Sequence, residues 1–355
     1  MSQHRGEYGI RSIWISHNKK VVGTLVDNGY EAYYYHSIKG IWYALRAKMY
    51  IFDNYSKDIN FWQSGGAIKV NLWHGVGNKR INYDNEHDKV RHPKNLWERM
   101  KYYPRRLSDE KPSHYILATS PMMREIFARA FQVPDNHVIE AGYPRNDYIL
   151  GADIKNLSSD EEKKALNQIL AWKEKGGKVD LYMPTFRDSE SRFLEIMDLQ
   201  KFNEFLKEHK ILFVTKLHPK SKLKDVFLEI LYSNIMNLDA DMDPYVFLGH
   251  SDMLTTDYSS VYSDYMLLDR PVVAFQYDYD EYSSKTRDGY FDFKEYMPEA
   301  EAKNMEELMN QTVKVLQLDE AREKRAISRK KIFSSRKFDG CKQLYRALSN
   351  LGNKE

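Results

Sequence analysis

Short apolar runs alternate with stretches of helical periodicity along most of the chain. In the first 150 residues the pattern predicts strands over 13–15, 21–26, 32–35, 48–52, 68–72, 115–118 and 138–141, and helices over 38–47 and 121–131. Residues 79–106 are basic and show little periodicity. Such alternation is typical of βαβ units built around a parallel sheet.

A second alternating series follows the polar residues 151–159, which we interpret as a linker. It predicts strands over 179–183, 211–217, 252–255 and 272–275, and helices over 160–175, 193–208, 304–316 and 320–333. A last helix, over 340–348, is expected to pack back on the first half. The sequence therefore predicts an α/β protein with two Rossmann-like parallel-sheet domains, residues 1–150 and 151–335, and a C-terminal helical segment, 336–355.

Residues 254–275 combine a strand, a polar turn, a helix and a second strand. Thr256 closes the first strand, Asp257 is a candidate N-cap, and Ser259 and Ser260 fall in the first helical turn. A helix N-terminus offers free N–H groups and a partial positive charge, so two hydroxyls placed there can hold a phosphate. An ordinary serine cap is the alternative interpretation.

Other polar side chains also stand just beyond predicted strands, where open parallel sheets bind their ligands. These are Asp53, His74, Arg145, Arg187 and His218. A histidine in a glycine-rich turn can act as a general base, and an arginine can bind a phosphate bidentately. The structural alternatives are a turn histidine at 74 and a surface salt bridge between Arg187 and Asp188.

Composition narrows the function classes. The 355 residues are 42% hydrophobic and 14% aromatic, which supports a sizeable core and argues against global disorder. The net charge of only +3 argues against a dedicated nucleic-acid binder, although local basic patches could meet anionic lipid or polymer. The single cysteine, Cys341, excludes an internal disulfide and a cysteine-based zinc site, which favours a reducing, cytoplasmic setting.

Several common signatures are absent from the sequence. No apolar run approaches the ~20 residues that span a bilayer, and the N-terminus has no apolar signal region. The sequence has no Walker motif, no Gly-x-Gly-x-x-Gly and no His-Glu-x-x-His. Asp239, Asp241 and Asp243 precede Pro244 in what we interpret as a solvated acidic loop, so no metal site is predicted.

Together these residues resemble the CDP-glycerol glycerophosphotransferases, the family of teichoic acid primases and polymerases and related capsule polymerases. The resemblance rests on Trp73-His74-Gly75 with Lys79, Gly142 to Asp147, Pro184 to Arg187, Lys216 to Pro219, Thr256 to Ser260 with Asp264, Arg270-Pro271, and the run from Phe275 to Tyr290. The sequence departs from the family in a shorter opening before residue 30 and in Glu299, where a glycine is expected after Pro298.

The resemblance implies a GT-B architecture with two domains facing a central cleft, the acceptor on the first and the CDP-linked donor on the second. It implies attachment to the cytoplasmic face of the membrane. It also implies a reaction in which an acceptor hydroxyl attacks the β-phosphorus of CDP-glycerol or CDP-ribitol and CMP leaves. No cofactor is required, although Mg²⁺ is allowed, and no nucleic acid is expected as a partner.

The resemblance further suggests residue roles. His74 would be the general base, oriented by Asp147, and His218 would assist catalysis. The donor would be bound by Arg187, Lys216, His218, Thr256, Asp257, Ser259, Ser260 and Asp264, and the acceptor by Gly75, Lys79 and Arg145. Two other functions stay open: a GT-B glycosyltransferase that uses a sugar nucleotide, and a non-catalytic protein that binds an anionic polymer.

Overall fold

The computed structural model describes residues 10–109, 113–152, 157–187, 190–229, 232–279, 281, 289–334 and 339–352. Asp188, residues 153–156 of the predicted linker and residues 282–288 of the family-like run lie outside the described residues. The chain divides into two compact units. The first unit comprises Met1–Gly75, Arg80–Asp147 and Lys331–Glu355, and the second comprises Val76–Lys79 and Tyr148–Lys330.

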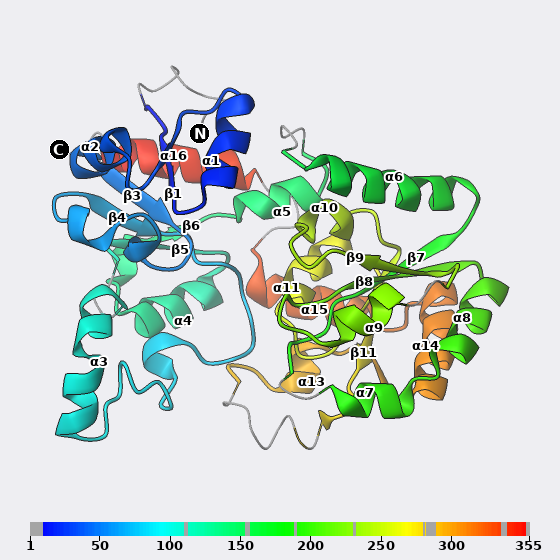
Figure 1. The fold of residues 1–355 in the computed structure, drawn as a ribbon. Coiled ribbons are helices and arrows are strands. Elements are labelled where there is room, and N and C mark those ends of the chain that lie inside the picture. The colour runs from blue at the N-terminus through cyan, green and yellow to red at the C-terminus, as the bar shows by residue number, and fades with distance from the viewer. Residues whose placement is uncertain are drawn as a thin grey trace. The chain divides into compact units, whose positions relative to one another are not determined.

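The first unit contains only parallel strand pairs among its described residues (Figure 1). A two-stranded sheet pairs β1 (Trp14–Ser16) with β2 (Ala32–Tyr34), and a four-stranded sheet has the order β3 (Met49–Phe52), β4 (Ile68–Asn71), β5 (Tyr115–Ala118), β6 (Val138–Glu140). Its helices are α1 (Lys19–Asp27), α2 (Ile38–Arg46), α3 (Leu96–Asp109), α4 (Pro121–Phe131) and α16 (Gly340–Gly352), while α5 (Pro144–Ile149) crosses into the second unit.

The second unit is built on one six-stranded parallel sheet. Its order is β12 (Ala300–Ala302), β11 (Val272–Phe275), β10 (Met253–Thr256), β7 (Lys178–Tyr182), β8 (Ile211–Lys216), β9 (Ile235–Leu238). The chain leaves β7 towards β8 and β9 and then returns to add β10 on the other side. The order therefore reverses between β7 and β10, and an open α/β sheet binds its ligand beyond the carboxyl ends of the strands at such a point.

Helices surround this second sheet. They are α6 (Asp160–Glu174), α7 (Ser191–Ile196), α8 (Leu199–Glu208), α9 (Leu223–Glu229), α10 (Tyr245–Leu248), α11 (Val261–Tyr265), α13 (Phe293–Tyr296), α14 (Met305–Gln317) and α15 (Arg322–Ile332). Phe202 of α8 and Leu308 of α14 share one buried cluster with Phe213 and Phe275 of the sheet. The predicted α/β class with parallel sheets is thus confirmed.

Three predictions of local structure were wrong. Residues 21–26 form part of α1 rather than a strand, because Asn18 caps the helix at the Lys20 N–H and only Leu25 of its residues is buried. Residues 96–109 form α3, which the prediction of a non-periodic stretch missed. The predicted helix over 193–208 is broken after Ile196, and Asp198 caps α8 at the Lys201 N–H.

A buried carboxyl group in β7 should make stability depend on pH. Asp180 is fully buried, one of its oxygens accepts a hydrogen bond from Thr255 Oγ1 (2.8 Å), and burial raises its pKa to about 7. The unfolded chain loses this proton near pH 4, so the contribution of Asp180 to stability should fall as pH rises from about 4 to about 7, by roughly 4 kcal/mol in all.

The measurement is urea unfolding of the wild type and of Asp180→Asn at several pH values. The difference between the two free energies of unfolding isolates the titration of residue 180. The free energy of unfolding of Asp180→Asn, relative to that of the wild type, should increase as pH rises from about 4 to about 7 and should then level off. Parallel pH curves for the two proteins would contradict the raised pKa.

Candidate functional site

The loops after β7 and β10 meet at the topological switch point of the second unit. Asp257, which is 1% exposed, accepts hydrogen bonds from the N–H (2.9 Å) and Oγ1 (2.7 Å) of Thr185. Asp257 also pairs with Arg187 Nη1 at 2.7 Å. The prediction that Asp257 caps the following helix was wrong, because α11 begins only at Val261 and the carboxylate is used to join the two loops.

Arg187 is held entirely by protein groups. Its Nε and Nη2 donate to the two oxygens of Asp278 (2.5 and 2.9 Å), and its Nη1 donates to Thr185 O (2.7 Å). Burial opposes ionisation of Asp278, but the hydrogen bond and charge of Arg187 outweigh it and lower the pKa of that carboxyl. The predicted bidentate phosphate clamp is therefore wrong here, since Asp278 occupies the guanidinium fork that a phosphate would need.

Ser259 and Ser260 lie at the start of α11, and Ser260 is exposed. Residues 76–79 reach them from the glycine-rich motif of the first half, because a Cβ atom added at Gly77 would lie 3.2 Å from the Ser260 Cβ. Asn78 fixes this segment to the second unit: its side chain exchanges two hydrogen bonds with the backbone of Phe291 (2.8 and 3.1 Å). Sequence reasoning missed this junction.

Lys79 belongs to the same segment. Its backbone forms an isolated antiparallel bridge with Gly289, and Tyr290 N donates to Asn78 O (2.7 Å). From the sequence, Lys79 was predicted to bind the acceptor together with Gly75 and Arg145. The structure instead places Lys79 in the unit that carries Ser259 and Ser260.

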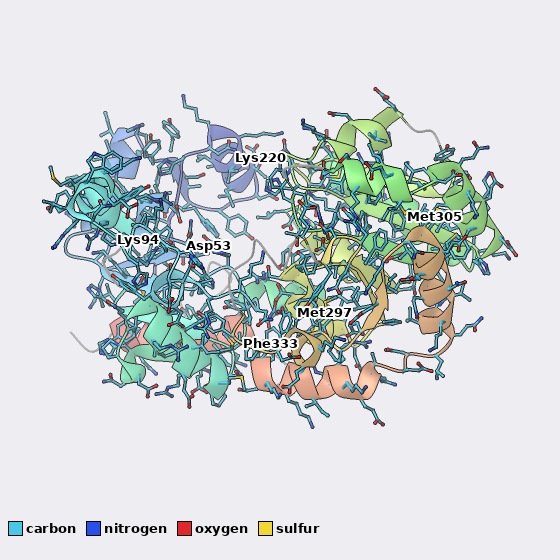
Figure 2. The ribbon with its side chains drawn as sticks, turned by 90° about the horizontal axis from the view of Figure 1, so that it is seen from below. Asp53, Lys94, Lys220, Met297, Met305 and Phe333 are labelled. Atoms are coloured by element: carbon cyan, nitrogen blue, oxygen red, sulfur yellow. The ribbon has the colours of Figure 1, made fainter. Side chains whose placement is uncertain are left out.

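His218 is exposed beyond the end of β8. The same loop carries Lys220, which Figure 2 labels. The His218 Nδ1 accepts a hydrogen bond from the Lys220 N–H (3.1 Å), so in the neutral ring the proton sits on Nε2. The ring centroid lies 5.0 Å from that of Phe186, in the loop after β7. His218 is thus able to donate from Nε2 to an anionic ligand.

Three other predicted donor residues have buried side chains with partners inside the protein. Lys216 Nζ donates to Ala240 O (2.7 Å), Thr256 Oγ1 donates to Met183 O (2.7 Å), and Asp264 accepts from the Tyr245 hydroxyl (2.5 Å). Burial lowers the pKa of Lys216, although the neighbouring acidic loop opposes this effect. These three side chains therefore make structural hydrogen bonds within the second unit.

In the first unit, His74 stands beyond β4 and is oriented by a backbone group. Its Nδ1 lies 3.0 Å from the carbonyl oxygen of Asp53, the residue after β3. A carbonyl can only accept, so Nδ1 carries the proton and Nε2 keeps its lone pair. This is the tautomer that a general base requires.

Asn71 shapes the turn that presents His74, and sequence reasoning did not identify it. Its side chain accepts from the Trp73 N–H (2.8 Å) and donates to Asn54 O (3.0 Å). Trp73 has a φ of +56°, an uncommon left-handed conformation that the Asn71 contact stabilises. The loops that carry Asp53 and His74 are thereby tied together.

Gly75 and Arg145, two of the residues predicted to bind the acceptor, lie against each other. Gly75 has a φ of +125°, and a Cβ atom there would overlap the Arg145 guanidinium. That guanidinium also lies 4.9 Å above the ring of Tyr143. Only glycine both adopts this backbone conformation and admits the arginine.

Asp147 does not orient His74, and this prediction was wrong. Its two carboxylate oxygens accept from the backbone N–H groups of Gly340 (3.0 Å) and Cys341 (2.7 Å), at the start of α16. The residue is 4% exposed. Asp147 therefore anchors the C-terminal helix, and the Asp53 carbonyl takes the role that the carboxylate was expected to play.

Among the described residues, no group of three or more histidine, cysteine, aspartate or glutamate side chains is placed to hold a metal ion. Within the same part of the chain, the acidic segment 239–243 has Asp239 accepting from the Asp241 N–H and Lys216 close by.

Comparison with known proteins places this arrangement in a family. The family model of CDP-glycerol:poly(glycerophosphate) glycerophosphotransferases matches residues 2–348. A teichoic acid poly(glycerol phosphate) polymerase of Bacillus spizizenii is 27% identical over 317 residues, covering 84% of this chain and 73% of the relative. A teichoic acid poly(ribitol-phosphate) polymerase of the same organism is 31% identical over 204 residues, covering 55% of this chain and 31% of the relative.

A solved structure of the wall teichoic acid polymerase TagF has a TM-score of 0.73 at 23% identity, covering 99% of this chain and 83% of that chain. This likeness confirms the predicted GT-B-like fold class. Because the family model extends over nearly the whole length, the chain belongs to the CDP-glycerol:poly(glycerophosphate) glycerophosphotransferase family.

Proposed function

We propose that the protein transfers glycerol phosphate from CDP-glycerol to a hydroxyl of a lipid-linked or polymeric teichoic acid acceptor and releases CMP. The observation that carries the proposal is His74, whose Nε2 lone pair is set by the Asp53 carbonyl in a turn beyond a parallel strand. A hydroxyl is a poor nucleophile at neutral pH, and a base held in this tautomer removes that obstacle.

In the proposed reaction, His74 Nε2 takes the proton of the acceptor hydroxyl as its oxygen attacks the β-phosphorus. The bond from that phosphorus to the bridging oxygen breaks, and CMP leaves with the electron pair. His218 Nε2–H, the hydroxyls of Ser259 and Ser260, and the start of α11 would stabilise the charge that develops on the phosphates. The proton on His74 then passes to solvent.

Arg187 serves this site indirectly. Because it bonds Asp278 and Thr185 and pairs with Asp257, it fixes the loop after β7 against the loop after β10. Both loops flank the switch point, where the donor would bind. Arg187 is therefore a positioning residue in this proposal.

The test is acceptor-dependent CMP release from CDP-glycerol and CDP-ribitol, with UDP-sugars as competitors and a glycerol phosphate lipid as acceptor. The relatives include both glycerol phosphate and ribitol phosphate polymerases, so both donors belong in the panel. Acceptor-dependent CMP release from CDP-glycerol would support the proposal. If a UDP-sugar were turned over and neither CDP-glycerol nor CDP-ribitol released CMP, the function would be glycosyl transfer. Binding of polymer without turnover of any donor would indicate a non-catalytic protein.

We further propose that α3 docks the enzyme on an anionic membrane, at the inner face of the cell membrane. None of the helices in the described parts of the chain has the length and apolar character needed to cross a bilayer. However, α3 exposes large apolar side chains at helical spacing: Leu96 (73%), Trp97 (66%), Met100 (69%) and Tyr103 (59%). Exposed basic residues alternate with them: Arg99, Lys101 and Arg105. Lys94, which Figure 2 labels, is exposed just before the helix. Such a helix lies in the interface of a membrane that carries negative charge.

The expected result is that Trp97→Asp/Met100→Asp lowers binding to vesicles of phosphatidylglycerol by about tenfold, because apolar burial is lost and the two added carboxylates oppose the attraction of the basic residues to the anionic lipid. Vesicle co-sedimentation measures it. Leu228→Asp is the matched control, since Leu228 of α9 in the second unit is 65% exposed. If Trp97→Asp/Met100→Asp bound the vesicles as tightly as Leu228→Asp, α3 would be rejected as the docking surface. The same would hold if the wild type bound neutral vesicles as tightly as anionic ones.

A variant of Asp147 tests the anchoring role that the structure gives this carboxylate. Asp147→Ala removes both acceptors from the start of α16 and should cost about 0.5–2 kcal/mol, as the loss of other caps does. Because His74 is oriented by a backbone carbonyl, kcat of the folded variant should change by no more than about twofold. Urea unfolding and CMP release measure the two effects. A collapse of kcat at unchanged stability would restore the catalytic role.

A further inference from the structure

A stack of three rings stands beyond the small parallel sheet of the first unit. His17 follows β1, and Tyr35 and His36 follow β2. The Tyr35 ring lies 3.7 Å from the His17 ring at 16° and 3.7 Å from the His36 ring at 38°, so a histidine covers each of its faces. Both histidines are exposed. The stack thus occupies the carboxyl ends of two neighbouring parallel strands, the edge at which such sheets bind ligands.

Hydrogen bonds fix the stack in place. Tyr35 N donates to Ser16 O (3.1 Å), which holds the two strand ends together. His17 Nε2 lies 3.2 Å from Ile59 O, and because a carbonyl only accepts, the proton of the neutral ring is on Nε2. His17 Nδ1 therefore keeps a lone pair that can accept a hydrogen bond from a hydroxyl.

The same contact connects the stack to the proposed base. Ile59 closes the segment that follows β3, and this segment begins with Asp53, whose carbonyl holds His74. The ring stack and His74 are thus both hydrogen-bonded to the backbone of the segment 53–59.

Cations surround the aromatic side chains of this region. Lys19 Nζ lies 5.0 Å above the Tyr34 ring and Lys39 Nζ lies 6.0 Å above the Tyr33 ring. The Arg11 guanidinium lies 4.7 Å above the Tyr43 ring, but it is already paired with Glu31. Cations next to ring faces suit a ligand in which anionic groups alternate with C–H and hydroxyl groups. A polyol-phosphate chain has that chemistry.

We propose that His17, Tyr35, His36 and Lys19 form a second acceptor subsite, which binds the polyol-phosphate chain at a distance from its reacting end. The inference rests on the proposed function, because the acceptor of the proposed reaction is the polyol-phosphate chain that this surface would bind. Lys19 pairs with a phosphodiester, the imidazole faces pack on the polyol C–H groups, and His17 Nδ1 accepts from a polyol hydroxyl. A longer acceptor then gains contacts that a single glycerol phosphate unit does not reach.

The experiment measures binding without any donor, so a failure of the proposed reaction does not affect it. The probe is an end-labelled oligo(glycerol phosphate), and its fluorescence anisotropy is followed as the full chain is added. In His17→Ala/His36→Ala/Lys19→Ala the dissociation constant should rise about tenfold or more, as expected for the loss of a charge-assisted contact together with ring packing. Glycerol 3-phosphate should compete equally weakly with wild type and variant.

The matched control is His209→Ala, since His209 is an exposed histidine packed on Phe205 in the second unit, with ring centroids 4.7 Å apart. Thermal unfolding confirms that each variant is folded. If the triple variant does not fold, His36→Ala alone gives the test, with a rise of at least about threefold expected. Unchanged binding by the folded variants would overturn the proposal. So would equally tight binding of an uncharged polyglycerol, because phosphate would then not be recognised.

Discussion

Replacing His74 by alanine should lower kcat for acceptor-dependent CMP release by about 10²–10⁴-fold, the usual contribution of a positioned general base. The structure gives the reason, because the Asp53 carbonyl holds the proton on Nδ1 and leaves Nε2 as the only ring atom able to take one. CMP affinity should change by no more than about twofold, since Ser259, Ser260 and His218, which we propose to bind the donor, are all in the second unit. Steady-state kinetics and CMP titration measure the two quantities.

His209→Ala serves as the control for loss of an exposed histidine and should retain wild-type kcat. A more specific comparison is His74→Gln, which keeps hydrogen-bonding capacity but cannot take a proton at neutral pH. Its kcat should fall as far as that of the alanine variant. If glutamine retained substantial activity, His74 would be a binding residue rather than the base.

The sequence was sufficient for most of the fold because buried parallel strands have a local signature. The strands at 49–52, 211–216 and 272–275 are apolar runs that end in polar turns, and they were predicted within a residue or two. Periodicity does not separate a strand from a helix in a short valine-rich segment, and the residues of α1 fit both equally well. The start of α3 did carry a signal that was overlooked: Asn95 caps the Glu98 N–H, and Glu98 accepts from Lys94 N–H.

The candidate site was predictable in its location but not in its pairings. Polar residues beyond strand ends converge because parallel strands present their carboxyl ends at one edge. Which of them touch is decided by segments far apart in sequence. Arg187 bonds Asp278, 91 residues away, and Asp147 bonds Cys341, 194 residues away. No local sequence pattern shows whether an arginine binds a carboxylate of the protein or a phosphate of a ligand.

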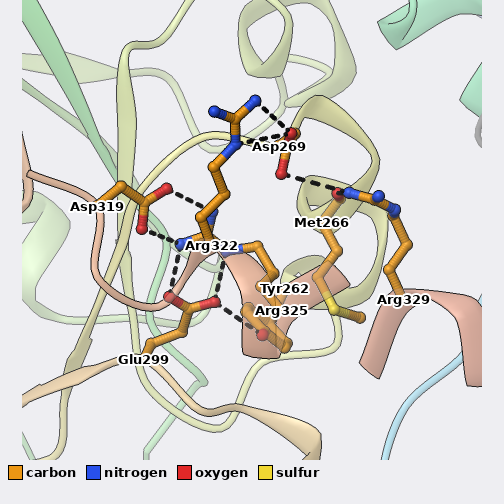
Figure 3. A network of polar contacts seen from close by, with 8 residues as sticks. All are labelled: Tyr262, Met266, Asp269, Glu299, Asp319, Arg322, Arg325 and Arg329. Carbon is orange, nitrogen blue, oxygen red and sulfur yellow. Dashed lines mark hydrogen bonds and ion pairs between the residues drawn. The ribbon is translucent and has the colours of Figure 1, made fainter. Parts of the chain in front are cut away.

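Replacing Arg325 by methionine should cost about 3–5 kcal/mol of stability, the usual penalty for removing one partner of a buried ion pair. Figure 3 shows the network: Arg325 donates to both oxygens of Glu299 (2.7 and 2.8 Å) and to both oxygens of Asp319 (2.7 Å each). The Arg325 and Glu299 side chains are fully buried. Without the guanidinium, Glu299 would keep only the hydroxyl of Tyr262 (2.9 Å) as its partner in the network of Figure 3. Urea unfolding measures the loss.

Arg322→Ala is the control from the same helix, because Arg322 is 66% exposed and pairs with Asp269. Its loss should cost no more than about 1 kcal/mol. If Arg325→Met cost no more than this control, the buried network would not be a stabilising element.

The double variant Arg325→Met/Glu299→Leu tests why glutamate follows Pro298 where the family resemblance led us to expect glycine. Removing both charges leaves no uncompensated carboxylate at position 299, so much of the stability lost in Arg325→Met should return. Such recovery would identify Glu299 as the partner of Arg325, which joins α15 to α11 through Tyr262. The departure at position 299 would then be explained by the buried ion pair with Arg325 rather than by a change in donor chemistry. Additive losses in the double variant would instead show that Glu299 and Arg325 stabilise the fold independently.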